Sequence, residues 1–196
     1  MSIDDDVTRR LPARRGHFLL ESGHHGDFWL DLEALCFEPA PIRELARGLC
    51  ARIERHRIDV VCGPLIEGAF VALMVAEQLG LPFVYSQPQR AGEAGGLFPV
   101  RYQLPGVLRP KVSGRRVAVV NDVVNAGSAV RGTLEDLRAC GATPIVIGTL
   151  AVLGSAARQL AADENVALET LVERPNTIWP PRDCPLCVAG IPLTTV

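Results

Sequence analysis

The sequence predicts an α/β fold: a doubly wound, mostly parallel sheet, with a small hood formed by the N- and C-terminal segments. Two observations predict the sheet. Helical and strand-like segments alternate from residue 40 onward, and the strand-like segments are apolar on both faces, as parallel strands covered by helices usually are. With 196 residues, 48% of them hydrophobic, the chain is expected to form one domain, 1–196, with its core at about 40–174 and its hood from 1–39 and 175–196.

Each element of the core is predicted from its periodicity and from the residues that end it. The helices repeat apolar residues every three or four positions, the strands are short runs rich in β-branched residues, and glycine ends most of them. The run RVAVV gives the strongest strand signal. In chain order we expect a helix over 42–53, a strand over 58–62, a helix over 67–79, strands over 83–85 and 116–120, a helix over 127–140, a strand over 144–153, a helix over 155–163 and a strand over 167–172.

The connection 87–114 interrupts this compact pattern. It is rich in glycine and proline and contains RAGEAGG at 90–96. A segment of this length without predicted structure is usually functional or mobile in a compact domain. We therefore expect residues 86–111 to close over a ligand.

Composition and charge exclude several classes of function. The net charge of −2 argues against a nucleic-acid partner, and only one of the 20 basic residues, Lys111, is a lysine. The N-terminal residues contain no apolar run of the kind that a secretory signal needs, and the longest uncharged window, 139–157, is broken by glycines and a proline. We expect a cytoplasmic protein with no membrane contact.

The stretch VAVVNDVVNAGSA, at 117–129, carries the clearest functional signal. Asp122 is expected just beyond the C-terminal end of a strand, which is where ligands bind in open α/β sheets, and a carboxylate there suits sugar hydroxyls. The small residues 125–129 open a helix, whose N-terminal N–H groups and dipole favour a phosphate. We call residues 125–129 the phosphate loop. The alternative is an ordinary turn in which Asn125 or Ser128 caps the helix.

This stretch resembles the phosphoribosyl pyrophosphate (PRPP) signature of the type I phosphoribosyltransferases. That signature is an apolar strand, two acidic residues, two apolar residues and a short Thr/Ala-Gly-Ser/Thr loop. The residues that match it are Asp122, Val123, Val124, Ala126, Gly127, Ser128 and Ala129.

Three further blocks resemble the orotate phosphoribosyltransferase branch of this family. FLLESGHHGDFWLDL, at 18–32, is similar to its N-terminal segment, and the residues 58–85 are similar to its strand, pyrophosphate loop and helix. CPLCVAGIPL, at 184–193, is similar to the end of one bacterial branch. Within the first block the matching residues are Ser22, Gly23, His25, Asp27 and Asp31.

The resemblance implies transfer of the 5-phosphoribosyl group of PRPP to a base, most simply orotate, with Mg²⁺ and release of pyrophosphate. It also implies a homodimer. Asp122 and Arg90 are the expected catalytic residues, and Asp122 would contact Mg²⁺ only indirectly, through PRPP. By position, the residues expected to bind the ribose and 5′-phosphate are Asn121, Asp122, Asn125, Ala126, Gly127, Ser128 and Ala129. The expected pyrophosphate loop is Gly63, Pro64, Leu65, Ile66, Glu67 and Gly68. The hood residues expected near the base are His25 and Phe28.

The chain departs from the family pattern at three places. Asn121 replaces the first acidic residue of the signature, and Ser86-Gln87 stands where the family usually has Arg-Lys. The segment 89–97 has Arg90 but lacks the usual lysine and histidine. These departures leave two alternatives open, namely a phosphoribosyltransferase for another base and a non-catalytic PRPP- or nucleotide-binding regulator. The residues available to supply positive charge in place of the lysine are Arg90, Arg101, Arg109 and Lys111.

Cys184 and Cys187 form an isolated CxxC motif. A zinc site needs four ligands, and no second CxxC or CxxH is present. His24, His25 or another cysteine would have to complete such a site through a tertiary contact or from a partner chain. The favoured interpretation is that these cysteines are structural.

Overall fold

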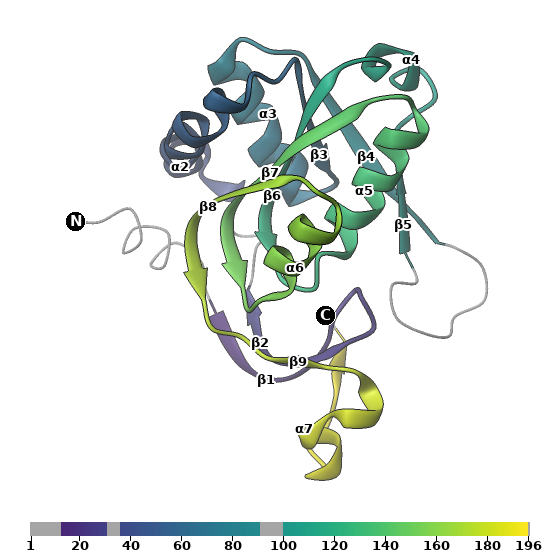
Figure 1. The fold of residues 1–196 in the computed structure, drawn as a ribbon. Coiled ribbons are helices and arrows are strands. Elements are labelled where there is room, and N and C mark those ends of the chain that lie inside the picture. The colour runs from purple at the N-terminus through teal and green to yellow at the C-terminus, as the bar shows by residue number, and fades with distance from the viewer. Residues whose placement is uncertain (1–12, 31–35, 91–99, 196) are drawn as a thin grey trace.

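The structure is a computed structural model that describes residues 13–30, 36–90 and 100–195, with only the backbone of Arg90. A six-stranded sheet forms its centre, in the order β5-β4-β3-β6-β7-β8 (Figure 1). Strands β3, β4, β6, β7 and β8 are parallel, and the edge strand β5 is antiparallel to β4. The strands are β3 (Val60–Pro64), β4 (Phe83–Arg90), β5 (Val100–Gln103), β6 (Arg116–Val124), β7 (Thr143–Leu153) and β8 (Ala167–Arg174).

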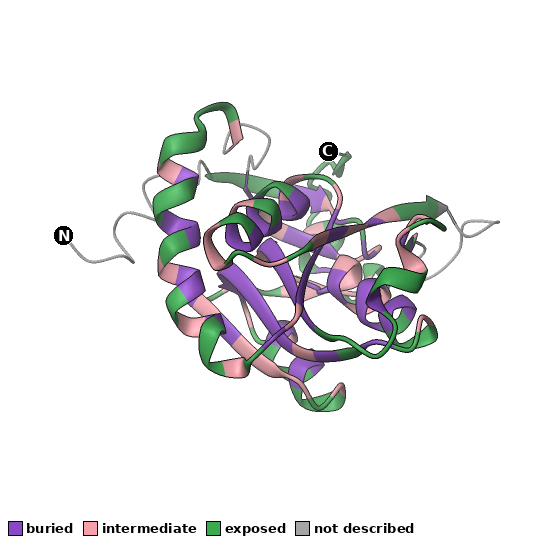
Figure 2. Cartoon of the chain, turned by 90° about the horizontal axis from the view of Figure 1, so that it is seen from above, coloured by how far each residue is buried: buried purple, intermediate pink, exposed green. Residues whose placement is uncertain are grey.

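Helices cover both faces of this sheet, as the sequence predicts. The helices α2 (Pro39–Ile53) and α3 (Glu67–Leu79) pack on one face, and α5 (Ser128–Ala139) and α6 (Ala156–Asp163) pack on the other. Successive residues of β6 alternate between the two packed layers: Ala118 and Val120 join the first, and Val117 and Val119 join the second. This alternation explains why the strands read as apolar on both faces. Figure 2 shows the buried strands between helices whose outer faces are exposed.

The two ends of the chain combine into a second, smaller sheet, which forms the hood. Its strand order is β10-β1-β2-β9, so the two N-terminal strands lie side by side between two strands from the C-terminal segment. The arrows of β7 and β8 point toward this sheet in Figure 1, which places the hood at the C-terminal ends of the core strands. Its elements are β1 (Ala13–Leu19), β2 (His25–Leu30), β9 (Ile178–Trp179), a 3-10 turn η3 (Pro181–Asp183), α7 (Pro185–Val188) and β10 (Thr194–Thr195).

Two sequence-based expectations about the strands are wrong. Strand β6 does not end at residue 120 but continues to Val124, so Asp122 lies within the strand and not beyond it. The reason is the length of the neighbouring strand β7, which pairs with β6 as far as Val152 and satisfies the backbone of the additional residues.

The connection 87–114 is also more regular than expected. Strand β4 extends to Arg90 and pairs with β5 as an antiparallel hairpin, and a short helix, α4 (Arg109–Val112), follows. Residues 91–99, which contain most of the glycine-rich stretch, lie outside the described residues. A further 3-10 turn, η2 (Glu54–His56), extends α2.

Within residues 13–30, 36–90 and 100–195, no helix has the length and apolar composition needed to cross a membrane.

Candidate active site

A pocket of about 250 Å³ lies between the hood and the C-terminal ends of β3 and β6. Three segments distant in sequence form most of its lining: the β1–β2 turn with β2, the loop after β3, and the continuous stretch from the end of β6 to the start of α5; Tyr102 of β5 and Leu153 of β7 complete it. The pocket therefore brings together most of the site residues that the sequence indicates. Those among its lining are Phe28, Pro64, Leu65, Ile66, Glu67, Gly68, Asn121, Asp122, Asn125, Ala126, Gly127, Ser128 and Ala129.

The phosphate loop forms the N-terminal end of α5. Gly127 precedes the helix with a φ of 81°, a left-handed conformation that glycine adopts without strain. The N–H groups of the first helical turn have no partner within the helix, and the helix dipole adds partial positive charge at the same point. The arrangement suits an anion, and the Ser128 hydroxyl adds a donor beside it.

An anionic group already lies against this donor. The hydroxyl of Ser128 donates to Oε1 of Glu21 at 2.7 Å, and the hydroxyl of Tyr102 donates to Oε2 of the same carboxylate at 2.8 Å. Burial and the Glu21 carboxylate raise the pKa of Tyr102, so its hydroxyl remains a donor. Glu21 thus accepts the hydrogen bond of the Ser128 hydroxyl, which an incoming phosphate would also accept. Neither Glu21 nor Tyr102 was identified from the sequence, because both reach the loop through non-local packing.

Asp122 is the most strongly perturbed acid of the pocket. It is 5% exposed, and burial raises its pKa to about 7, with the nearby Glu67 carboxylate adding to the effect. Backbone hydrogen bonds from Val123 and from Asp122 itself oppose the rise. Near neutral pH the carboxyl therefore lies close to the midpoint of its titration, and a hydroxyl-rich or cationic ligand would favour its charged form.

The side-chain amide of Asn121 occupies a tightly defined position next to Asp122. Its Nδ2 donates to the carbonyl oxygen of Val123 at 2.8 Å, which an ionised carboxylate at this position could not do. A Cβ on Gly68 would lie 2.0 Å from Asn121 Oδ1, so glycine is required for the two segments to approach this closely. Asn121 therefore connects β6 with the pyrophosphate loop.

The pyrophosphate loop links β3 to α3 at the edge of the pocket. Residues 64–68 line the pocket, whereas Gly63 lies just behind it in the core, where a Cβ would meet Ala72 Cβ at 2.5 Å. The peptide bond between Leu65 and Ile66 is cis. The loop ends at Glu67, the first residue of α3, so the Glu67 carboxylate sits at the pocket.

The two hood residues expected near the base have different positions. Phe28 lines the pocket, together with Trp29. His25 is 5% exposed and is absent from the lining; its imidazole lies against His17 and Cys187. Asn125 lines the pocket, but its Oδ1 accepts a hydrogen bond from Asn176 Nδ2 at 3.0 Å, which ties the phosphate loop to the C-terminal segment of the hood.

The lining carries negative charge without a compensating cation. Among the described lining residues, three are acidic, Glu21, Glu67 and Asp122, and none is lysine or arginine. Oxygen-rich acidic sites of this kind fit Mg²⁺, which binds carboxylates together with substrate phosphates. A polyanionic ligand would need such a cation, or basic side chains from elsewhere.

The basic residues considered as replacements for the missing lysine lie in different surroundings. The side chain of Arg90 lies outside the described residues. Arg101 and Lys111 are exposed. Arg109 Nη1 contacts both oxygens of the buried Asp136, at 2.8 and 2.9 Å, and this pair fastens α4 to α5.

Ser86, the first residue of the Ser86-Gln87 departure, lies within β4 and faces the interior. It is fully buried, and its hydroxyl lies 2.6 Å from the hydroxyl of Thr133 on α5. A long basic side chain could not occupy this position without displacing the helix. The serine at this point is therefore explained by packing.

Comparisons with known proteins agree with this geometry. Residues 39–183 match the family model described as phosphoribosyl transferase domain. Orotate phosphoribosyltransferase of Caldanaerobacter subterraneus subsp. tengcongensis is 32% identical over 180 residues, which cover 91% of this chain and 87% of the relative. Orotate phosphoribosyltransferase of Pelotomaculum thermopropionicum is also 32% identical, over 177 residues that cover 90% of this chain and 86% of the relative.

Solved structures show the same fold. The crystal structure of orotate phosphoribosyltransferase from Aeropyrum pernix has a TM-score of 0.65 and 25% identity, covering 87% of this chain and 93% of that chain. Adenine phosphoribosyltransferase from Rhodothermus marinus has a TM-score of 0.68 at 16% identity, covering 88% of this chain and 98% of that chain. Similarity of fold alone therefore does not distinguish one base from another.

Proposed function

The chain belongs to the phosphoribosyl transferase family, and from this premise we propose that it transfers the 5-phosphoribosyl group of PRPP to orotate, with release of pyrophosphate. The names of the relatives support an enzyme over the non-catalytic regulator considered as an alternative. Orotate is favoured over other bases because the two relatives at 32% identity carry that name over almost their whole length. Adenine phosphoribosyltransferases share the fold at much lower identity.

The observation that carries the proposal is the placement of Asp122 beside the N-terminus of α5 in one pocket. The phosphate loop supplies backbone N–H groups and the Ser128 hydroxyl to the 5′-phosphate. Asp122, which Val123 and Val124 separate from the loop, accepts hydrogen bonds from the ribose hydroxyls. Asn121 also lines the pocket, and its Oδ1 lies next to Gly68 of the pyrophosphate loop.

The proposed reaction exchanges one bond at C1 of the ribose. The C1–O bond to pyrophosphate breaks, the leaving oxygen keeps the electron pair, and a ring nitrogen of the base forms the new C1–N bond. The proton that this nitrogen carried in the free base passes to the departing pyrophosphate. Positive charge develops on the ribose between these events. The protein contributes mainly by holding the ribose and both phosphate groups in a fixed orientation, and the nearby carboxylates of Asp122 and Glu67 stabilise positive charge.

The acidic lining supports Mg²⁺ as the cofactor. Glu67 and Asp122 would hold it, Asp122 indirectly through PRPP-bound oxygens, and the ion would neutralise charge on the departing pyrophosphate. Binding of PRPP would also displace the Glu21 carboxylate from Ser128, because the two anions compete for one donor. Arg90 at the end of β4 is the proposed source of positive charge from the chain itself.

We further propose a homodimer. The outer face of α3 exposes two large apolar side chains, Phe70 at 43% and Leu73 at 50%, next to the exposed Ile66 of the pyrophosphate loop. A second copy packed on this face would shield these side chains from water. Light scattering of Phe70→Glu against wild type tests this: the variant should be monomeric, and a wild-type monomer would contradict the proposal.

The test of the proposed function measures binding and turnover in one preparation. PRPP is titrated calorimetrically into the protein with Mg²⁺, orotate is then added, and released pyrophosphate is assayed. We expect saturable binding and pyrophosphate release that depends on orotate and on Mg²⁺. Ser128→Ala should weaken PRPP binding by about 10- to 100-fold, the usual effect of one lost hydrogen bond to a charged group. Binding without release for any base would contradict transfer.

A further inference from the structure

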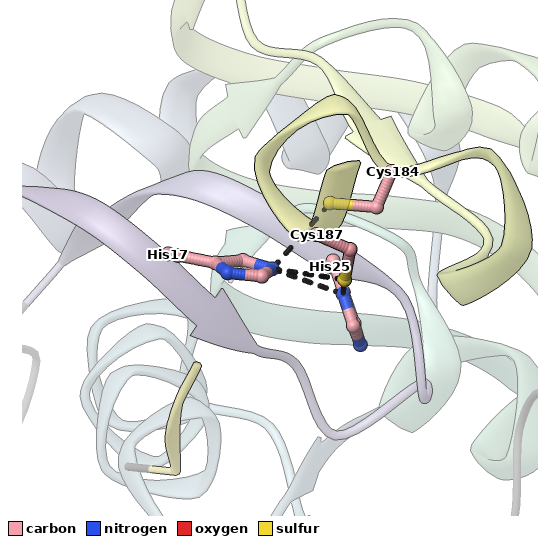
Figure 3. A group of neighbouring side chains, drawn as sticks. All are labelled: His17, His25, Cys184 and Cys187. Atoms are coloured by element: carbon pink, nitrogen blue, oxygen red, sulfur yellow. Dashed lines mark hydrogen bonds between the residues drawn. The ribbon is translucent and has the colours of Figure 1, made fainter. Parts of the chain in front are cut away.

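We propose that His17, His25, Cys184 and Cys187 bind one zinc ion that fastens the N-terminal and C-terminal halves of the hood together. The four potential ligand atoms, two nitrogens and two sulfurs, all lie within 4.8 Å of one another. Figure 3 shows the side chains converging from the two hood strands and from the segment at α7. None of the four lines the pocket described above, so this is a separate site.

The distances between the ligand atoms fit a tetrahedral ion. With Zn–N near 2.1 Å and Zn–S near 2.3 Å, a tetrahedral arrangement has edges of about 3.4 Å for N–N, 3.6 Å for N–S and 3.8 Å for S–S. Here His17 Nε2 lies 3.0 Å from His25 Nδ1 and 3.4 Å from Cys184 Sγ. Cys187 Sγ lies 3.7 Å from His17 Nε2 and 3.2 Å from His25 Nδ1. These four distances lie within about 0.4 Å of the tetrahedral values, and the two remaining pairs of ligand atoms lie within 4.8 Å.

The hydrogen bonding of His17 prepares its ring for a metal. Its Nδ1 lies 2.8 Å from the carbonyl oxygen of Ile191, which can only accept, so Nδ1 carries the proton and Nε2 presents a lone pair to the cluster. Histidine ligands of zinc usually donate their other N–H to an outer partner in this way. The second ring nitrogen of His25 points away from the cluster (Figure 3).

The fold, and not the local sequence, assembles these ligands. Leu19 lies opposite His25 in the β1–β2 pairing, and His17 precedes Leu19 by two residues, so the imidazoles are diagonal neighbours on one face. Parallel pairing of β10 with β1 brings the C-terminal segment back over that face, with Phe18 opposite Thr194. This placement supplies the tertiary contact that an isolated CxxC motif lacks.

Chemistry favours zinc over other occupants. Two thiolates and two neutral imidazoles form a common structural zinc set, and this set suits neither Mg²⁺ nor Ca²⁺, which prefer oxygen ligands. All six cysteines of the described structure are free, so no disulfide competes for Cys184 and Cys187. Because Glu21 and Ser22 lie in the turn between the two histidines and line the pocket, the ion would also steady one wall of the active site.

The first experiment is the zinc content of purified full-length protein, by elemental mass spectrometry after dialysis against metal-free buffer. We expect about one zinc per chain in wild type and almost none in Cys184→Ser. Two variants serve as matched controls and should keep the ion. Cys140→Ser changes a cysteine outside the cluster, and His24→Gln changes a residue next to the proposed ligand His25. Zinc content in Cys184→Ser equal to wild type would overturn the assignment.

A second measurement does not depend on a variant that folds. Wild-type protein from which the metal was removed is titrated with Co²⁺, whose absorption reports coordination geometry. Intense visible bands of tetrahedral Co²⁺, together with thiolate-to-metal charge transfer that Zn²⁺ abolishes, are the expected result. Weak octahedral bands without charge transfer, or an intact-protein mass showing a Cys184–Cys187 disulfide in the presence of excess zinc and reductant, would refute the site.

Discussion

Replacing Asp122 with asparagine should make the protein more stable and less active, and the gain in stability should depend on pH. Burial and the Glu67 carboxylate raise the pKa of Asp122 from 3.8 to about 7. The folded chain therefore binds a proton more tightly than the unfolded chain, and stability falls as pH rises between these two values. At 1.36 kcal/mol per unit, the ionised carboxylate costs roughly 4 kcal/mol above pH 7, and about 1.6 kcal/mol at pH 5.

The assay is thermal unfolding of wild type and Asp122→Asn without Mg²⁺, at about pH 5 and pH 8. An amide keeps the size and one acceptor oxygen but cannot ionise, so it removes the whole cost. For a chain of this length 1 kcal/mol corresponds to about 2–4 °C, which gives a gain of roughly 8–16 °C at pH 8 and about a third of that at pH 5.

Activity should move in the opposite direction. Loss of a charged acceptor for the ribose should lower kcat/KM by about 10- to 100-fold. An equal change of Tm at both pH values, or a variant less stable than wild type at pH 8, would refute the argument that burial of this carboxylate destabilises the ligand-free fold.

Three further substitutions test the contacts around the pocket. In Gly68→Ala the new Cβ would lie 2.0 Å from Asn121 Oδ1, so we expect PRPP affinity to fall at least tenfold by calorimetry, whereas Gly106→Ala, which meets nothing within 4 Å, should match wild type. Asn121→Asp loses the donated bond to Val123 and adds a buried charge, so its melting temperature should drop further below wild type as pH rises. Glu21→Gln removes the anion that competes at the phosphate loop and should tighten PRPP binding several-fold; unchanged affinity would mean that the Glu21 contact does not oppose the ligand.

The core of the fold could be predicted because its signals are local. The helix over 67–79, for example, is bounded as expected, since its apolar spacing and the glycine after it are both visible in the sequence. The end of β6 could not be predicted in this way. Asn121 and Asp122 resemble loop residues in the sequence, and the pairing of 121–124 with β7 keeps them in the strand.

The part of the site that one continuous segment supplies could be predicted from the sequence. The residues 121–129 carry both the carboxylate and the phosphate loop, so a single motif reveals them. Glu21 and Tyr102 meet Ser128 only because the β1–β2 turn and β5 pack against the start of α5. No periodicity or spacing connects these positions.

The cysteine and histidine cluster shows the same limit more clearly. His17 and Cys184 are 167 positions apart, and their contact depends on the pairing of β1 with β10. The sequence therefore shows two cysteines at metal-binding spacing and offers His25 among several candidate partners, but it does not indicate His17. Strand register and the return of the C-terminal segment, which are tertiary properties, complete the set.

Identification of the nucleotide product tests the central claim most directly. The protein is incubated with Mg²⁺, PRPP and an equimolar mixture of orotate, uracil, adenine and hypoxanthine, and the products are identified by mass spectrometry. The account predicts a single product, the 5′-phosphoribosyl derivative of orotate, and its absence when PRPP or Mg²⁺ is omitted. A nucleotide of another base in its place, or no nucleotide from any base, would contradict the account.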